Sequence, residues 1–267
     1  MKNHNILITN DDGIESPGLR AAVEAVIDIG NVTVVAPSHQ QTGTGRGLTG
    51  NKESALEQID YQVNGTAVRA YHCECSPAMA VRHSLRTIFK GNPPDLLISG
   101  INYGENLGIN ITCSGTVGAA LEASSSGIPA IAISKQTDIE SHHQYTDQDW
   151  SASSYFLNRF AGYLLKEKLQ TDVDVLKIDV PGDATPLTKC KLTRLAKVAY
   201  YYRTIENPTV KSKIYEGKTF IKVNREDLDP ESDIYAFAID RFVSVTPLSI
   251  DLTSRVQLSE LQGLIEK

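Results

Sequence analysis

Residues 4–18 read HNILITNDDGIESPG, and this stretch decides the fold. Its apolar run, residues 5–9, predicts a buried strand, which stops at two adjacent carboxylates, Asp11 and Asp12, followed by Gly13. Asn, Asp and Gly tolerate turn geometry, so a simple turn accounts for the glycine and one aspartate. It does not account for the pair, and a turn and a ligand site both stay open at this point.

The first two-thirds of the chain alternate short β-branched runs with helical patterns, which indicates parallel βαβ units. Near-continuous apolar runs suit strands that are buried on both faces. We therefore expect an α/β fold with a doubly wound, mostly parallel sheet. The expected strands are residues 5–9, 32–37, 94–100, 129–134 and 174–181, and the expected helices are residues 18–30, 76–89, 114–126 and 149–170.

The character of the chain changes near residue 186. Residues 191–205 and 233–248 are longer, Tyr- and Thr-rich alternating segments, which are typical of antiparallel hairpins. Residues 256–267 predict a terminal helix. We expect an α/β core over residues 1–185 and a hairpin arm with a terminal helix over residues 186–267.

Composition narrows the range of partners. The chain has 26 basic and 32 acidic residues and a formal net charge of -6, so it lacks the basic surface that a nucleic acid polymer needs. No apolar run is long enough to cross a bilayer, and residues 1–4 lead into a strand pattern and not into a signal peptide. Four cysteines in 267 residues make no disulfide framework. We expect a cytoplasmic protein with no membrane partner.

The stretch YHCECSP, residues 71–77, contains three side chains that bind soft metals: His72, Cys73 and Cys75. A closed zinc site needs a second ligand pair at a suitable spacing, and none follows. The alternation favours a half-buried strand instead.

Oxygen-bearing side chains follow several of the predicted strands. Asp11 and Asp12 follow the first, Thr42 lies in the loop after the second, and Asn102 follows the third. In an open α/β sheet these strand ends converge on the ligand site. Carboxylate, hydroxyl and amide oxygens suit a hard divalent cation, so we expect one Mg²⁺ or Mn²⁺ ion at this edge.

Residues 113–129, CSGTVGAALEASSSGIP, add an anion site. Ser114 is a good N-cap, and Gly127 followed by Pro129 marks a stop. The helix N-terminus offers backbone N–H groups and its positive dipole end, and the hydroxyls of Ser114 and Thr116 can donate as well. Because the helix starts just after the loop that holds Asn102, we expect a phosphate beside the cation.

Three competing motifs fail. The glycine-rich residues 42–47, TGTGRG, lack the order of a dinucleotide fold or a P-loop. The NDDGI stretch has Asn10 where a haloacid-dehalogenase-like phosphatase needs its aspartate nucleophile. No serine sits in a G-x-S-x-G elbow.

Five blocks of the sequence, in order, resemble the SurE family (survival protein E), which are metal-dependent 5'/3'-nucleotidases. The blocks are ILITNDDGIESPGL (6–19), VVAP (34–37), ISGINYGENLG (98–108), SGTVGAALEASSSGIPAIAIS (114–134) and VSVTPLSIDLT (243–253). The resemblance implies a Rossmann-like core, a nucleoside monophosphate substrate, and a swapped C-terminal arm that builds homodimers or homotetramers.

The resemblance also assigns residues. It makes Asp11, Asp12 and Asn102 the catalytic residues and metal ligands, with Thr42 in place of the family's serine as the fourth ligand. The residues on the phosphate side that match the family are Asn106, Ser114, Gly115 and Thr116.

Some positions depart from the family pattern. They are Ser38, Met79, Ala80, Lys177 and Asp179. These departures leave two alternatives open: a nucleotide-binding regulator with weak catalysis, and a phosphatase of polyphosphate or sugar phosphates. The acid that protonates the leaving group is also open between Asp11, Asp12 and a water on the metal.

Overall fold

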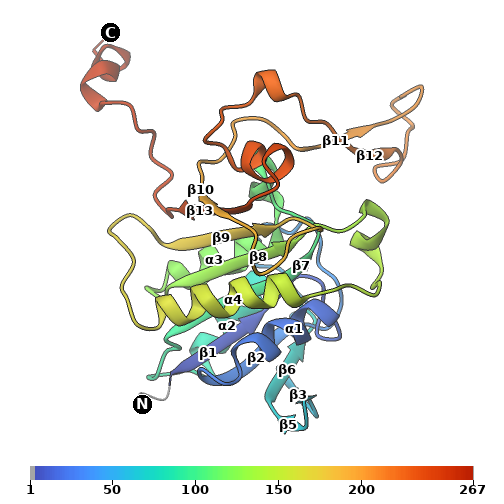
Figure 1. Ribbon diagram of the computed structural model, residues 1–267, viewed down its shortest axis with the longest axis vertical. Helices are drawn as coiled ribbons and strands as arrows, with labels where there is room; N and C mark the ends of the chain where they lie inside the picture. Colours follow the sequence, from blue (N-terminus) through green and yellow to red (C-terminus); the bar gives the residue numbers. More distant parts are fainter. Residues whose placement is uncertain (1–3, 267) are drawn as a thin grey trace.

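The computed structural model describes residues 4–266, and a nine-stranded mixed sheet forms its centre (Figure 1). Residues 1–3, in our expected lead-in to the first strand, and residue 267, the last of the expected terminal helix, lie outside the described residues. In spatial order the strands are β10 (Cys190–Leu192), β13 (Val243–Leu248), β9 (Val175–Val180), β8 (Ala130–Lys135), β7 (Leu96–Tyr103), β1 (Asn5–Thr9), β2 (Asn31–Pro37), β6 (Arg69–Cys73) and β3 (Glu57–Ile59).

The six central strands, from β9 to β6, are all parallel to one another. At the two sides, β13 pairs antiparallel with β9, and β3 pairs antiparallel with β6. The chain leaves β1 for β2 on one side and later enters β7 on the other side of β1. This change of direction makes the sheet doubly wound, as the alternation of strands and helices predicted.

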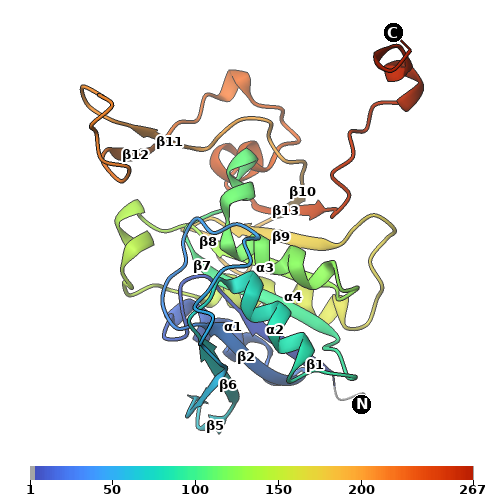
Figure 2. The same cartoon turned by 180° about the vertical axis from the view of Figure 1, so that it is seen from behind.

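Helices cover both faces of the sheet. They are α1 (Pro17–Val26), α2 (Pro77–Arg86), α3 (Gly115–Ser124) and α4 (Ser151–Leu164). Helices α1 and α4 lie on one face and α2 and α3 on the other (Figures 1 and 2). Strand β1 serves both layers, because Ile6 and Ile8 pack toward α1 while Leu7 packs toward α3. Strands buried on both faces explain the uninterrupted apolar runs in the sequence.

Local signals account for the helix that borders the site. The side chain of Ser114 caps α3 by accepting a hydrogen bond from the backbone N–H of Val117 at 3.1 Å. The segment after α3 turns at Gly127, whose φ of +77° suits glycine. The expected helix and its N-cap are therefore confirmed.

The C-terminal segment differs in part from our expectation. Strands β11 (Tyr201–Thr204) and β12 (Lys218–Ile221) form an antiparallel hairpin that projects from the core (Figures 1 and 2), which confirms one hairpin. However, β10 pairs in parallel with β13 within the main sheet. The sequence before β13 is also not a strand, because residues Tyr235–Ile239 form a π-helical turn, η4.

Tertiary contacts explain this helical turn. The side chain of Ser232 accepts a hydrogen bond from the N–H of Tyr235 at 3.2 Å, as a capping residue does. Phe237 is fully buried and packs edge-on against Tyr200, with 6.4 Å between the ring centroids. Ile234, Ala236 and Phe237 are thus buried from a helical turn and not from the strand that the alternating pattern predicted.

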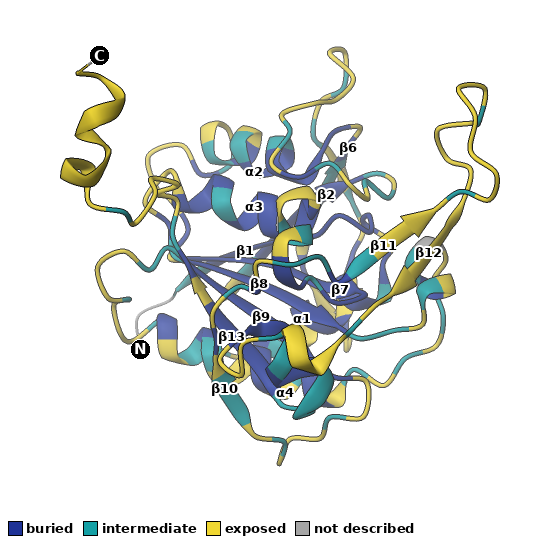
Figure 3. Cartoon of the chain, turned by 90° about the horizontal axis from the view of Figure 1, so that it is seen from above, coloured by how far each residue is buried: buried dark blue, intermediate teal, exposed yellow. Residues whose placement is uncertain are grey.

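The remaining elements are short. They are β4 (Gln62–Val63), β5 (Thr66–Ala67), and the 3₁₀ helices η1 (Gly108–Cys113), η2 (Ile139–His143), η3 (Arg225–Asp227) and η5 (Leu258–Leu264). The expected terminal helix is thus a single 3₁₀ segment, η5. Burial is concentrated in the central strands and the helix faces toward them, whereas the hairpin and the C-terminal end are largely exposed (Figure 3). Among residues 4–266, no helix combines the length and apolar character needed to cross a membrane.

Candidate active site

The predicted site residues meet at the carboxyl ends of β1 and β7, the two neighbouring strands at which the chain changes direction. A cavity of about 210 Å³ opens there, and Asp11, Asp12, Thr42 and Asn102 all line it. The structure therefore brings together all four side chains that the sequence proposed as metal ligands.

The turn after β1 is closed by residues other than the two carboxylates. The side-chain oxygen of Asn10 accepts a hydrogen bond from the Gly13 N–H at 3.2 Å, and its amide nitrogen donates to the Gly13 carbonyl at 3.1 Å. Gly13 has a φ of +103°, which favours glycine. Because Asn10 and Gly13 make the turn, Asp11 and Asp12 are left to face the cavity. This resolves the question raised by the sequence: a turn is present, but the carboxylates are not needed to form it.

Asp11 is held by the start of α3. The hydroxyl of Thr116 donates to Asp11 Oδ1 at 2.5 Å. A Cβ atom at position 115 would lie 2.7 Å from the Cβ of Asp11, so only glycine fits there. Burial raises the pKa of Asp11 to about 6, although the hydrogen bond from Thr116 and the backbone of Gly115 oppose this rise.

Asp12 is held from the other side. Its Oδ2 atom accepts a hydrogen bond from the Tyr103 N–H at 3.1 Å, and its Oδ1 atom accepts one from the Gln40 side chain at 3.2 Å. Burial, and next the charge of Asp11, raise the pKa of Asp12 to about 8. Within the protein, these two buried carboxylates repel each other.

The donor set at this edge fits a hard divalent cation. Two adjacent buried carboxylates with raised pKa values are stabilised in their charged form by a nearby cation. Among the residues whose side chains the structure describes, no group of three His, Cys, Asp or Glu suited to a metal is found. A cation here would therefore depend on two carboxylates together with hydroxyl and amide oxygens, a set that suits Mg²⁺ or Mn²⁺ better than zinc.

Asn102 lines the cavity, and the hydrogen bonds of its amide nitrogen leave its side-chain oxygen without a role in the loop. Its amide nitrogen donates to the carbonyls of Tyr103, at 3.2 Å, and Gly104, at 2.7 Å. These two bonds orient the amide and leave its carbonyl oxygen available as a ligand.

The exposed Thr42 is positioned by a loop that is fastened to α3. The N–H of Gly45 donates to the Cys113 carbonyl at 3.0 Å, and a Cβ at position 118 would lie only 2.1 Å from the Gly45 carbonyl oxygen. Arg46 pairs with the buried Glu122 at 2.9 Å. The glycine-rich stretch after β2 is therefore a close-packed support for Thr42.

The predicted phosphate-side residues divide into two groups. Asn106 and Ser114 line the cavity. Gly115 and Thr116 do not line it but contact Asp11, and the Thr116 hydroxyl is fully buried and donates to that carboxylate. All four residues lie at this edge of the sheet, with two facing the cavity and two supporting its carboxylates.

Sequence reasoning missed several residues of the cavity wall, chiefly Glu105, His142 and Tyr201. The rings of His142, from η2, and Tyr201, from β11, meet edge-on with centroids 5.8 Å apart. Both residues come from segments far from the motifs along the chain, so no local signal pointed to them. Glu105 lies inside the quoted GINYGEN block, and its charge beside a proposed phosphate was a signal that could have been used.

Glu105 is a second kind of carboxyl in the cavity wall. Its side chain is buried and neither oxygen makes a well-formed hydrogen bond, although the hydroxyls of Tyr200 and Tyr201 lie nearby. Burial raises the pKa of Glu105 to about 7. This carboxyl can therefore hold or release a proton near neutral pH.

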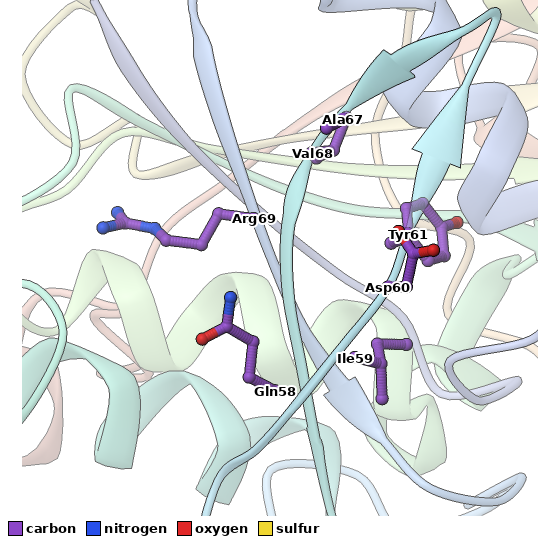
Figure 4. A pocket seen from close by; sticks show the side chains of 7 residues that line it. All are labelled: Gln58, Ile59, Asp60, Tyr61, Ala67, Val68 and Arg69. Carbon is purple, nitrogen blue, oxygen red and sulfur yellow. The ribbon is translucent and has the colours of Figure 1, made fainter.

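Two other features compete less well as sites. The stretch with His72 and Cys73 is strand β6, as expected, and Ser38 Oγ hydrogen-bonds the Nδ1 atom of His72 at 2.8 Å. A hollow of about 490 Å³ lies along β3 and β6, but Arg69 and Gln58 point to one side of the strands, away from Tyr61 on the other (Figure 4). Its polar groups do not converge.

Comparison with known proteins agrees with this geometry. Residues 6–202 match the family model described as Survival protein SurE. A protein from Thermococcus gammatolerans named 5'-nucleotidase SurE is 42% identical over 97% of this chain and 95% of its own length. A protein of the same name from Thermococcus kodakarensis is 38% identical, over 97% and 98% of the two chains.

A solved structure also aligns over the full chain. The SurE protein from Aquifex aeolicus superposes with a TM-score of 0.74 at 29% identity, over 98% of both chains. The matching family model, the full-length relatives and the shared fold together place this chain in the SurE family.

Proposed function

We propose that this chain is a phosphomonoesterase that hydrolyses nucleoside 5'- and 3'-monophosphates to nucleoside and phosphate with the help of one divalent cation. The observation that carries the proposal is the buried pair Asp11 and Asp12, two like charges at the point where the sheet changes direction. The name 5'-nucleotidase SurE of the full-length relatives supports a nucleotide substrate.

Asp11, Asp12, Thr42 and Asn102, which all line the cavity, would hold the cation, Mg²⁺ or Mn²⁺. When bound, such an ion supplies positive charge that stabilises a transferring phosphoryl group. Thr116 orients Asp11, and the N–H of Tyr103 orients Asp12, so both carboxylates keep their direction before the substrate arrives.

The start of α3 and the loop after β7 bind the phosphate. The oxygen of the Ser114 side chain accepts the capping bond from Val117, which leaves the Ser114 hydroxyl hydrogen free to donate to an anion. The helix N-terminus adds its positive dipole end. The amide nitrogen of Asn106 carries two hydrogens, and only one is used in its 2.8 Å bond to Ser134, so the other is available to a phosphate oxygen.

The test is phosphate release from a panel of 5'- and 3'-nucleoside monophosphates with Mg²⁺, Mn²⁺ or EDTA. We expect release that needs a cation, and a fall in kcat/KM of roughly 100-fold or more in Asp11→Asn, because a ligand of the ion is lost. Asp60→Asn is the matched control, because Asp60 is an exposed carboxylate in the other hollow, and it is expected to keep the wild-type rate.

The same panel separates the alternatives. Saturable nucleotide binding without phosphate release would identify a regulator and overturn the enzyme proposal. Faster release from sugar phosphates or polyphosphate than from any nucleotide would overturn the nucleotide substrate but keep the phosphatase.

We also propose that residues 186–267 join this chain to further copies in a homodimer or homotetramer, with the arm formed by the parts that lie outside the main sheet, such as the β11–β12 hairpin and the segment after β13. The segment exposes apolar side chains that water does not favour; the most exposed are Leu187, Val210, Ile214, Tyr215 and Leu252. Sedimentation analysis measures the assembly, and a monomer at micromolar concentration would contradict the arm's role.

Four unpaired cysteines support a reducing compartment such as the cytoplasm.

A further inference from the structure

A cluster of three buried charges lies behind the phosphate side of the cavity. Lys177 and Asp179 come from β9, and Asp233 comes from the C-terminal segment. Lys177 Nζ lies 2.5 Å from Asp179 Oδ2 and 3.2 Å from Asp233 Oδ2. All three side chains are at most 1% exposed.

The cluster holds both backbone groups of one residue of the site. Asp179 Oδ1 accepts a hydrogen bond from the Asn106 N–H at 2.7 Å, and Lys177 Nζ donates to the Asn106 carbonyl at 2.8 Å. An ion pair two residues apart on one strand therefore fixes the peptide groups on either side of the Asn106 Cα.

Asp233 holds the next turn of the same loop. Its Oδ2 atom accepts a hydrogen bond from the Gly108 N–H at 3.0 Å, and its Oδ1 atom accepts one from the Ala196 N–H at 2.9 Å. Between these anchors, Leu107 is fully buried in an apolar cluster with Ile234 and Phe237. The loop after β7 is thus fastened to the sheet at one residue and to the C-terminal segment at another.

Stability alone does not explain why charges occupy these positions. Buried ion pairs are costly to desolvate, and apolar side chains of similar size often stabilise a fold equally well or better. Burial disfavours the charge of Lys177, but the two carboxylates outweigh this effect and raise its pKa, so the ammonium stays charged. Apolar side chains cannot grip a backbone N–H and a backbone carbonyl at once, whereas this ion pair does.

We infer that Lys177 and Asp179 are positioning residues, which fix the backbone of Asn106 so that its side-chain amide faces the phosphate of the substrate. This inference rests on the proposed function, because it takes Asn106 to be a phosphate ligand. It predicts that disturbing the pair weakens phosphate binding and leaves the cation site intact, because the pair hydrogen-bonds Asn106 and none of the four proposed metal ligands.

The experiment uses Asp179→Asn in the full chain and measures two affinities separately. Inorganic phosphate is titrated by calorimetry in the presence of Mn²⁺, and Mn²⁺ alone is titrated by electron paramagnetic resonance. We expect the affinity for phosphate to fall about tenfold or more, as for a lost charge-assisted hydrogen bond. The affinity for Mn²⁺ is expected to stay within about twofold, and KM for a nucleotide to rise more than kcat falls.

Two further variants sharpen the test. Lys177→Met removes the donor to the Asn106 carbonyl, and we expect it to lower the phosphate affinity in the same direction as Asp179→Asn. Asp240→Asn is the control. It removes the ion pair between Asp240 and Lys191, whose charged atoms lie 3.2 Å apart and which does not line the cavity, so we expect the affinities for phosphate and Mn²⁺ to stay unchanged. If Asp179→Asn does not fold, Asp233→Asn disturbs the same loop through Gly108 and takes its place.

The outcomes are distinct. An Asp179→Asn protein with unchanged phosphate affinity, or with equal losses for phosphate and Mn²⁺, would overturn the positioning role. A wild-type protein that releases phosphate from no substrate would instead overturn the proposed function, whatever the variants do.

Discussion

Two clusters of buried charge differ in composition: Asp11 and Asp12 line the cavity, and the cluster around Lys177 lies behind Asn106, a residue of the cavity wall. Asp11 and Asp12 carry two like charges, whereas Lys177 lies between Asp179 and Asp233 and supplies a cation from the chain itself. Burial raises the pKa values of Asp11 and Asp12, and it also raises the pKa of Asp179, although the Lys177 ammonium opposes that rise. Burial of charge therefore takes two forms here: the uncompensated cluster, Asp11 and Asp12, has no ion pair with a cation among the described residues, which suits the metal ion that we propose, and the compensated cluster around Lys177 holds a loop.

The largest expected effect on folding comes from the compensated cluster. Lys177→Met removes the cation between Asp179 and Asp233 and should lower the free energy of unfolding by about 3–5 kcal/mol. Urea denaturation measures this loss. Lys191→Met, which breaks the partly exposed pair with Asp240, is the matched control and should cost about 0–1 kcal/mol. Similar losses in the two variants would contradict the contrast between the clusters.

The uncompensated cluster should make the metal-free protein sensitive to pH. The pKa values of Asp11 and Asp12, about 6 and about 8, lie above the ordinary 3.8. Between about pH 4 and pH 8, the folded protein therefore binds more protons than the unfolded chain. The contribution of the pair to the free energy of unfolding is therefore full below about pH 4 and falls as pH rises toward 8.

Adding Mn²⁺ should reverse this loss, by about 2.7 kcal/mol at a hundred times its Kd. The gain should be larger at pH 8 than at pH 6, because protons compete with the cation. Thermal unfolding in EDTA and in Mn²⁺ across this range measures both effects. A cation effect that does not depend on pH would argue against binding at the carboxylates.

Asp11→Asn should separate stability from function. Without metal at pH 8, the free energy of unfolding of the variant should be on the order of 1–3 kcal/mol higher than that of the wild type, because the repulsion between Asp11 and Asp12 is removed. It should also lose the stabilisation by Mn²⁺. Thermal unfolding of both proteins in EDTA gives the comparison, and a variant less stable than the wild type would show that the pair is not under repulsion.

Thr42 should give the smallest effect, since it is exposed and contributes one neutral oxygen. Thr42→Ala should weaken Mn²⁺ binding by roughly 1 kcal/mol, the worth of one ordinary polar contact. Thr42→Ser keeps the hydroxyl and should keep the affinity. An unchanged affinity and rate in Thr42→Ala would remove Thr42 from the ligands.

Much of the core was predictable because its signals are local. The apolar run at residues 5–9 matches β1 residue for residue, and the Ser114 cap and the Gly127 stop bracket α3 as expected. The gathering of Asp11, Thr42 and Asn102 followed from a topological rule, because parallel strands end at the same edge. Only the structure shows that hydrogen bonds between Asn10 and Gly13 close the turn, so that neither aspartate side chain is needed to form it.

The C-terminal segment was less predictable. The π-helical turn at Tyr235–Ile239 has an alternating sequence, but the burial of Ala236 and Phe237 and the capping by Ser232 favour a helical turn there. Glu105, His142 and Tyr201 reach the cavity from three separate segments. Pattern reasoning could have found Glu105, which lies inside a quoted motif block, but not His142 or Tyr201, because nothing along the chain records which loops will meet.

The sequence by itself determined the main strands and helices of the core, their order and the edge at which the oxygen-bearing side chains gather, because these depend on periodicity, caps and strand direction. Tertiary structure alone decided which charges compensate one another. Lys177 and Asp233 are far apart in sequence yet 3.2 Å apart in space, while Asp11 and Asp12 are neighbours with no cation from the chain. The strength of a charge interaction depends on distance and burial, and both exist only after the chain has folded.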